Sequence, residues 1–459
     1  MSGLTETVAR FIAESSFADI PGAATDKAKK VITDTIGVIL AGAGSELAPP
    51  LMAYLQRSGE AGGQPILGTG RTTSAELAAM INGSFGHALD FDDVLSMMPA
   101  HPSAVILPAL FADLDGADGR RLLEAYIIGI EVGAKIGLGI RIGHYHRGFH
   151  GTGTLGIFSA LAALAKLHRL DVPTTRQAFG IAASMSSGLQ RNFGTMVKPL
   201  HTGWAARSAL AAVRLAQCGY SAAQDVLEAK AGFFAAYGTE QSDPQLTADT
   251  LGRPWTMLDP GIALKKFACC YASHRPIDGI TQLRAQLGFD AGSIEKVVCR
   301  MPPGARRALI YSKPVTGLQA KFSLDYPLAA GVLDGKFSLR TFTDAAVLRP
   351  EIQALYAKLE LIDDPRLIDQ NPQFESLSPG SRGFVEVEAM TKNGNGAKTR
   401  IDHAPGSPAR ELSWDEVSAK FLDCAAQTSI PRAGSERALG ALRKLEHCNA
   451  VADVIALLR

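Results

Sequence analysis

Apolar and polar positions along the first half of the chain follow a helical period. From the start to roughly residue 250, Ala, Leu and Ile recur at spacings of three and four, and the breaks fall at Gly, Pro and Asp. Few segments show the alternation of a strand. We therefore predict an all-helical first domain, and its clearest helices cover residues 26–40, 74–89, 121–136, 154–168, 174–188 and 204–217.

The pattern changes after Pro260. Residues 296–301 form a predicted short strand, and residues 383–390 alternate between apolar and polar positions. An Asn- and Gly-rich turn joins the second segment to residues 398–401, which predicts a β-hairpin. Because helices lie between these strands, residues 260–405 are predicted to form a smaller α+β domain.

Helical periodicity returns in the last part of the chain. Ser413 and Glu416 form a capping-box pattern ahead of a predicted helix at 417–426, and a final helix is predicted from Ala433 to the end. A helical segment that follows an inserted unit can rejoin the first domain. We expect a mostly α fold, in which residues 1–259 and 406–459 form one large domain and residues 260–405 the other, with a ligand site at the seam.

Charge and terminal patterns narrow the class of protein. Lys and Arg number 46 against 45 Asp and Glu, so the chain lacks the basic excess typical of nucleic-acid binding. The N-terminus has acidic residues and helical periodicity instead of a secretory signal. The most apolar segment, 122–143, carries Glu131, Lys135 and Arg141, which favours a buried helix over a membrane span. We expect a cytoplasmic protein with no membrane or nucleic-acid partner.

Cysteine and glycine spacing excludes several cofactor motifs. The six cysteines include no C-x-x-C pair, and their spacing fits neither a zinc nor an iron–sulfur site, so we predict free thiols. No P-loop occurs, and no G-x-G-x-x-G follows a strand. Gly129, Gly133 and Gly137 recur every four residues, which indicates a close crossing of two buried helices more than a membrane dimerisation face.

The first candidate chemical site is the string HALDFDD at 87–93, followed by His101-Pro102-Ser103. Three carboxylates between two histidines could bind a divalent metal. They could equally place one carboxylate beside one imidazole as an acid–base pair. A capped helix end with solvated aspartates is the structural alternative.

Two further stretches place ionisable groups at predicted helix starts. His150 precedes Gly151 and Thr152, where backbone N–H groups and the helix dipole favour a carboxylate. Lys198 stands just ahead of the next predicted helix, where it could offset negative charge that develops beside a carboxylate. An ordinary helix cap and a surface lysine are the structural alternatives.

The fourth stretch is KKFACCYASHR at 265–275. Lys265, Lys266 and His274 make an anion-binding edge at the entry to the second domain. Cys269 or Cys270 could instead act as a nucleophile with His274, but no third member of a triad is apparent. Tyr311 carries little evidence by itself.

These stretches, in this order, resemble the MmgE/PrpD family over nearly the whole chain. The similar blocks are HALDFDD with HPS, FHGTGTLG at 149–156, KPLHTGWAA at 198–206, KKFACCYASHRPIDG at 265–279 and YSKPVTGLQAKFSLDY at 311–326. The family includes 2-methylcitrate dehydratase, cis-aconitate decarboxylase and an iminodisuccinate epimerase. The resemblance implies a helical domain built from both chain ends, an α+β lid, a homodimer, a small polycarboxylate substrate, and no metal or organic cofactor.

The resemblance also implies a set of site residues. The catalytic set would be Asp90, His101, His150, Lys198 and Tyr311. Substrate binding would involve Gly151, Thr152, Lys265, Lys266 and His274. In this interpretation His101 or His150 removes a proton next to a carboxylate, Lys198 stabilises the charge, Asp90 orients a histidine, and Tyr311 or the second histidine delivers a proton.

The resulting prediction is a metal-independent lyase, similar to 2-methylcitrate dehydratase. A dicarboxylate epimerase and a cis-aconitate-type decarboxylase are the alternatives. A helical scaffold without activity is disfavoured, since it would need none of the intact site residues. Val94 stands where the tricarboxylate enzymes of the family carry Thr, and Met97 and Met98 follow it, which predicts a less polar pocket rim.

Overall fold

The computed structural model describes residues 3–368 and 379–459, and it divides into two compact units. Unit 1 comprises residues 1–191, 197–264 and 413–459, and unit 2 comprises residues 192–196 and 265–412. Residues 192–196, which the prediction placed in the first domain, belong to unit 2, and residues 369–378 of the predicted second domain lie outside the described residues. Helices make up 55% of the chain and strands 9%, which confirms the mostly α class.

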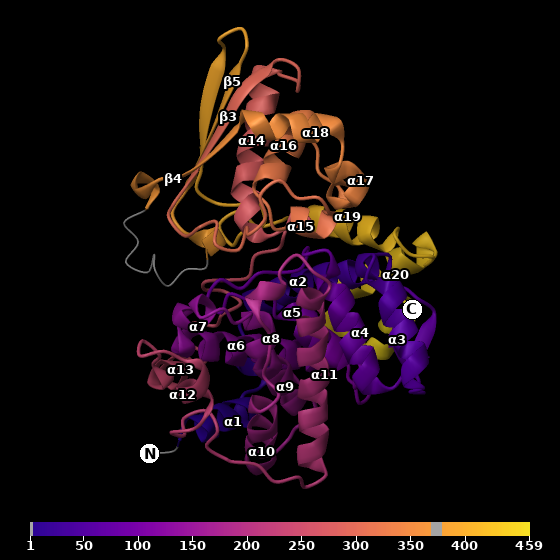
Figure 1. The fold of residues 1–459 in the computed structure, drawn as a ribbon. Coiled ribbons are helices and arrows are strands. Elements are labelled where there is room, and N and C mark those ends of the chain that lie inside the picture. The colour runs from indigo at the N-terminus through magenta and orange to yellow at the C-terminus, as the bar shows by residue number, and fades with distance from the viewer. Residues whose placement is uncertain (1–2, 369–378) are drawn as a thin grey trace. The chain divides into compact units, whose positions relative to one another are not determined.

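The described part of unit 1 is mostly helical (Figure 1). It also contains a short two-stranded ladder. Its strands are β1 (Gln64–Ile66) and β2 (Arg71–Thr73). Its helices are α1 (Leu4–Glu14), α2 (Gly22–Ala43), α3 (Ala48–Ser58), α4 (Ala75–Ala88), α5 (Ser103–Phe111), α6 (Gly119–Ile140), α7 (Ile142–His146), α8 (Gly151–Thr154), α9 (Gly156–Leu167), α10 (Val172–Ala183), α11 (Val197–Gln217), α12 (Phe233–Tyr237), α13 (Pro244–Thr250), α19 (Trp414–Ala425), α20 (Arg432–Leu442) and α21 (Val451–Ala456).

Three predicted helices differ from the structure at points that bear on the site. The predicted helix at 154–168 is interrupted at Leu155, so α8 is only four residues long. Helix α11 begins at Val197, which places Lys198 inside its first turn instead of ahead of it. The predicted final helix is divided into α20 and α21, with a 3-10 turn at Leu445–His447 between them.

The C-terminal segment packs into unit 1 through helix α19. The predicted capping box is confirmed, because Ser413 and Glu416 exchange side-chain to backbone hydrogen bonds. Farther along the helix, the buried Lys420 ammonium lies 2.8 Å from the Asp34 carboxylate of α2. It also donates to the main-chain oxygen of Phe91 at 2.8 Å and lies 3.7 Å from the centre of that ring. Helix α19 thus fixes the loop that follows α4.

Helices α4 and α11 cross at a pair of glycines. A Cβ placed on Gly83 would lie 2.8 Å from the Gly203 Cα, and one on Gly203 would lie 2.0 Å from the Met80 main-chain oxygen. The two backbones therefore meet with no room for a side chain. This close approach brings together His87, one turn after Gly83, and Lys198, at the start of α11.

Replacing Gly203 with Ala is expected to destabilise the protein by about 1–3 kcal/mol, because the added methyl group forces the two helices apart. Activity should fall as well, since the same crossing sets the distance from His87 to Lys198. Gly440→Ala is the matched control, because a Cβ there meets nothing within 4 Å and alanine favours the helix. Chemical denaturation and turnover of both variants check this prediction. Equal stabilities would contradict it.

Helix α6 confirms the prediction of a buried helix with close glycine crossings. A Cβ on Gly129 or Gly133 would collide with Ser159 of α9. Glu131 and Lys135 are both 1% exposed, and the Glu131 carboxylate accepts hydrogen bonds from main-chain N–H groups of residues 252 and 256. Among the described residues, no single helix has the length and apolarity to cross a membrane, although α2 and α3 pass that test as a pair bent by 82°.

Unit 2 contains a four-stranded sheet with the order β4-β3-β5-β6. Its strands are β3 (Ile294–Met301), β4 (Leu359–Asp363), β5 (Val385–Thr391) and β6 (Gly396–Ile401). Its helices are α14 (His274–Leu287), α15 (Gly317–Ala320), α16 (Asp325–Leu333), α17 (Asp344–Val347) and α18 (Pro350–Leu355). The predicted hairpin is confirmed as β5 and β6. Strand β4, a short edge strand parallel to β3, was not predicted.

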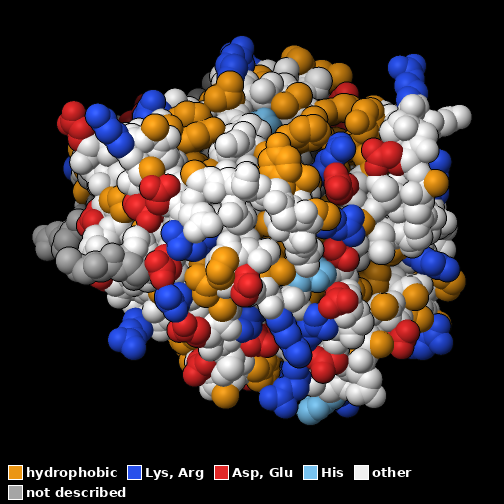
Figure 2. Space-filling view, turned by 90° about the horizontal axis from the view of Figure 1, so that it is seen from below, with side chains coloured by type: hydrophobic (Ala, Val, Ile, Leu, Met, Phe, Trp, Pro, Cys, Tyr) orange, Lys and Arg blue, Asp and Glu red, His pale blue; other side chains and the backbone are white. Residues whose placement is uncertain are grey.

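Both signs of charge are distributed over the molecular face in Figure 2. Lys and Arg side chains alternate there with Asp and Glu, and apolar side chains lie between them. This face therefore has the mixed character that the near-equal totals of basic and acidic residues predict.

Candidate active site

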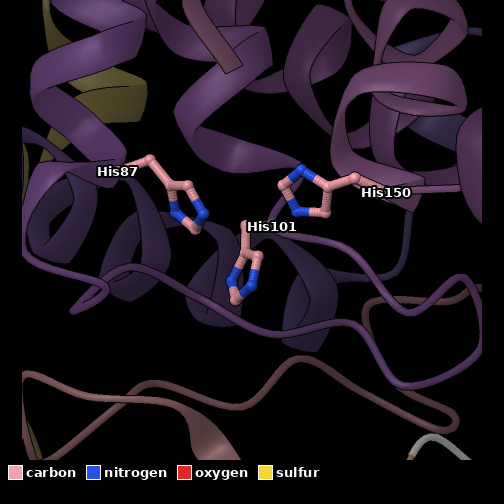
Figure 3. A group of neighbouring side chains, drawn as sticks. All are labelled: His87, His101 and His150. Carbon is pink, nitrogen blue, oxygen red and sulfur yellow. The ribbon is translucent and has the colours of Figure 1, made fainter. Parts of the chain in front are cut away.

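Four segments of unit 1 contribute ionisable side chains to one buried group. His87 lies in the last turn of α4, and residues 89–93 follow as a loop. His101 precedes α5, His150 caps α8, and Lys198 lies in the first turn of α11. Figure 3 shows the imidazoles of His87, His101 and His150 converging, and their ring centres lie 4.5–6.4 Å apart.

Lys198 joins the aspartate loop to His87. Its ammonium contacts the Asp90 carboxylate and lies 2.7 Å from Nε2 of His87. Because an ammonium group can only donate, Nε2 of His87 accepts this bond. Nδ1 of His87 then carries the proton and donates to Asp92 at 2.7 Å. The result is a continuous chain of hydrogen bonds from Asp92 through His87 and Lys198 to Asp90.

Asp90 takes an unusual backbone conformation to reach Lys198. Its φ is 50°, in the left-handed region that Asp tolerates better than most residues. Its main-chain N–H donates to the His87 carbonyl at 3.2 Å, immediately after the end of α4. Strained conformations of this kind persist where the surrounding contacts hold them, and they are concentrated at functional sites.

The main chain fixes the tautomer of His101. Its Nδ1 lies 2.6 Å from the main-chain oxygen of Asp93, and since a carbonyl can only accept, Nδ1 donates. In the neutral ring, Nε2 is therefore the lone-pair nitrogen. Thr152 also holds His101 in place, because its hydroxyl oxygen accepts a hydrogen bond from the main-chain N–H of His101 at 3.1 Å. His101 is the most exposed of the three converging histidines, at 14% of its side chain.

His150 is buried and contacts a fourth histidine. Its Nδ1 lies 3.0 Å from Nδ1 of His201, which follows Lys198 by one turn on α11. Burial, followed by the Lys198 charge, lowers the pKa of His150 well below its usual value. The same causes lower the pKa of His201 to about 4. Both rings are therefore neutral near pH 7.

Asp93 contacts His101 through its main-chain oxygen, whereas its carboxylate binds Ser103. Its side chain is fully buried and accepts the Ser103 hydroxyl at 2.6 Å, and that hydroxyl lies 2.7 Å from the Tyr126 hydroxyl. Burial, with the neighbouring charge of Asp92 as a further cause, raises the pKa of Asp93 to about 8. The carboxyl group is thus largely protonated at neutral pH.

This raised pKa predicts how stability depends on pH. An unfolded Asp titrates near pH ~3.9, so between about pH 4 and pH 8 the folded state holds one more proton at Asp93. Stability from this group is then lost as the pH rises through that range. Asparagine at position 93 does not titrate, so Asp93→Asn lacks this loss. The denaturation midpoint of the variant relative to that of the wild type should therefore be higher at pH 7.5 than at pH 5. Parallel pH profiles of the two proteins would contradict this expectation.

The structure brings together part of the predicted site. Asp90, His101, His150, Gly151, Thr152 and Lys198 all lie in this group of unit 1. The role expected from the dipole at Gly151 and Thr152 is weakened, because α8 is only four residues long. Sequence reasoning did not include His87, Asp92 and His201 among the site residues. The position of His201 one helical turn after Lys198, and that of His87 at the end of the apolar helix, were signals for two of them.

The other four predicted residues belong to unit 2 and stay predictions. The Tyr311 hydroxyl donates to the Phe193 main-chain oxygen at 3.0 Å. His274 is buried, and its Nε2 lies 3.3 Å from the main-chain oxygen of Cys269. Lys265 is buried and Lys266 is exposed. All six cysteines lie in the described residues, and none forms a disulfide.

The loop after the aspartates packs into unit 1 through Val94 and Met98. Val94 pairs with Ala263 through main-chain bonds of 2.8 and 3.0 Å, and its side chain is buried. Met98 is also buried, against Gly137 of α6. Met97 is only partly buried, and the less polar pocket rim stays a prediction.

Comparisons with known proteins show the family to which the chain belongs. The MmgE/PrpD N-terminal domain matches residues 6–245, and the MmgE/PrpD C-terminal domain matches residues 267–446. The chain therefore belongs to the MmgE/PrpD family. Among its relatives, the cis-aconitate decarboxylase of Mus musculus is 28% identical over 86% of this chain and 81% of its own length. That of Homo sapiens is 27% identical over 92% and 87%, and that of Aspergillus terreus 27% over 78% and 78%.

Proposed function

We propose that this chain is a lyase that decarboxylates a small unsaturated tricarboxylate of the cis-aconitate type. The observation that carries the proposal is the Lys198 ammonium, held by Asp90 and His87 beside the imidazoles of His101 and His150. The relatives named above, which match most of this chain, are decarboxylases by name. They favour carboxyl loss over the dehydration that the sequence motifs first suggested.

The chemistry of decarboxylation requires the groups that meet here. When the bond from carbon to the carboxyl group breaks, its electron pair moves through the double bond toward a second carboxylate. A fixed cation stabilises that charge, which is the role we assign to Lys198. A carbon atom then takes one proton, and His150, neutral at pH 7, is the proposed donor. His101 is the proposed second acid–base group, through Nε2.

We further propose that the reaction needs no divalent metal. Within residues 3–368 and 379–459, two groups of side chains have metal-ligand spacing, namely His87 with His101 and His150, and His87 with Asp90 and Asp92. Lys198 contacts His87 in both groups and Asp90 in the second. A divalent cation would have to displace this ammonium or lie against its charge.

One assay separates the candidate reactions. The purified chain is incubated with cis-aconitate, with hydroxylated tricarboxylates and with chiral dicarboxylates in deuterated water, with and without a chelator. Release of carbon dioxide with one deuteron incorporated supports the proposal. An alkene formed without carbon dioxide indicates a dehydratase, and inversion with exchange indicates an epimerase. Loss of activity in the chelator would contradict metal independence.

A further inference from the structure

A second histidine pair extends the candidate active site beyond the three converging rings. His150 is 2% exposed, and its Nδ1 lies 3.0 Å from Nδ1 of His201. His201 keeps part of its surface exposed. The two rings are tilted by 54°, with their centres 5.3 Å apart. His201 therefore lies between a buried acid–base group and the surface of unit 1.

The backbone around this pair leaves space for the two rings and little else. The His150 N–H donates to the Gly188 carbonyl at 3.0 Å. A Cβ on Gly188 would lie 3.3 Å from Cγ of His201 and 3.6 Å from Cβ of His150, and φ of Gly188 is +136°. A Cβ on Gly153 would lie 3.3 Å from Cβ of His201. Glycines at these positions thus allow the two imidazoles to meet.

Two neutral imidazoles that face each other through Nδ1 share one proton. If His201 donates this proton, the neutral His150 carries its own proton on Nε2 and can act as an acid. If His150 donates it, Nε2 of His150 has a lone pair and can act as a base. The position of this one proton therefore decides which role His150 can take.

We propose that His201 is a proton relay that recharges His150 from solvent during decarboxylation. This inference rests on the proposed function. When the bond from carbon to the carboxyl group breaks, its electron pair ends on a carbon that takes the Nε2 proton of His150. In the same step the Nδ1 proton of His201 moves to Nδ1 of His150, and Nε2 of His201 takes a proton from water, so both rings stay neutral. Both tautomers are then exchanged, and reorientation of the two imidazoles restores the Nε2 proton of His150 before the next turnover. One proton is consumed for each carbon dioxide released.

A proton relay to solvent is needed only in a reaction with a net uptake of protons. Dehydration and epimerisation each remove one proton and return one, so the buried histidines could exchange it between themselves. Decarboxylation of an ionised carboxylate takes up one proton per turnover and must draw it from solvent. A buried His150 cannot supply this proton repeatedly without a path to the surface.

The experiment combines variants of His201 with chemical rescue. His201→Ala should lower kcat about 100-fold with little change in KM, because proton delivery is lost while substrate contacts remain. Added imidazole should restore much of the rate, since it can occupy the space and carry a proton. His201→Gln keeps a hydrogen bond to His150 without a relay, so its kcat should also fall. His168→Ala, a partly exposed histidine at the end of α9, is the control that imidazole should not affect.

Each outcome decides one of the two proposals. If the wild type releases no carbon dioxide from any tricarboxylate, the proposed function fails and the relay fails with it. If the wild type does so and His201→Gln keeps its full kcat, only the relay is overturned. A slow His201→Ala variant that is folded by circular dichroism but insensitive to imidazole would show that His201 only positions His150.

Discussion

Replacing Lys198 with Met is expected to lower kcat by about 10²–10³-fold or more, the range seen when one fixed charge-stabilising group is lost. Methionine retains the apolar stem of the side chain but removes the ammonium. The Asp90 carboxylate would then be buried without its cation, which costs about 3–5 kcal/mol of stability. Steady-state kinetics and chemical denaturation of the purified variant measure the two effects.

Two further variants separate catalysis from stability. Lys198→Met combined with Asp90→Asn removes both charges, so stability should recover while activity stays low. Lys135→Met is the matched control, because Lys135 is equally buried and lies 3.5 Å from Glu131 on α6, away from the imidazoles. It should lose stability but keep its kcat once folded. Similar kcat values for the two single variants would remove Lys198 from the proposed mechanism.

Replacing His101 with Asn is expected to reduce turnover by about 10²–10⁴-fold, the usual contribution of an acid–base group. The amide of Asn can donate to the Asp93 carbonyl as Nδ1 of His101 does. It has no counterpart of Nε2, so the loop should stay in place while the acid–base atom is lost. His101→Ala should be equally slow but less stable, because it also loses the bond to Asp93.

Measurements of kcat and of the thermal midpoint for both variants test this separation. Near-normal turnover in a folded His101→Asn protein would exclude His101 as an acid–base group. A fall in activity for His101→Ala alone, with His101→Asn intact, would instead assign it a positioning role through Asp93.

Much of the fold follows from local patterns in the sequence. The predicted segments at 26–40, 74–89 and 121–136 coincide almost fully with α2, α4 and α6, whereas the one at 174–188 runs five residues past the end of α10. The break at Leu155 was missed because the helical period of the apolar residues continues after it, although Gly151, Gly153 and Gly156 were a signal of weak helix propensity. Strand β4 was missed because five residues at a sheet edge are stabilised by pairing with β3, which is distant in sequence.

The sequence predicted which residue types form the site but not which side chains contact each other. The string HALDFDD indicates an acid–base or metal group, yet nothing in it assigns Asp92 to His87 and Asp90 to Lys198. That division depends on the left-handed backbone at Asp90 and on the glycine crossing of α4 with α11. The role of Asp93 depends on its burial against Ser103, which the string of letters cannot reveal.

The contact of Lys420 with the Phe91 carbonyl joins residues 329 positions apart in the chain. During synthesis from the N-terminus, the aspartate loop leaves the ribosome long before the lysine that fixes it. The other helices of unit 1 can associate earlier, but the loop acquires this support only when α19 arrives. A nascent chain halted before residue 413 should therefore be largely helical yet inactive, and activity should appear only once α19 has been made.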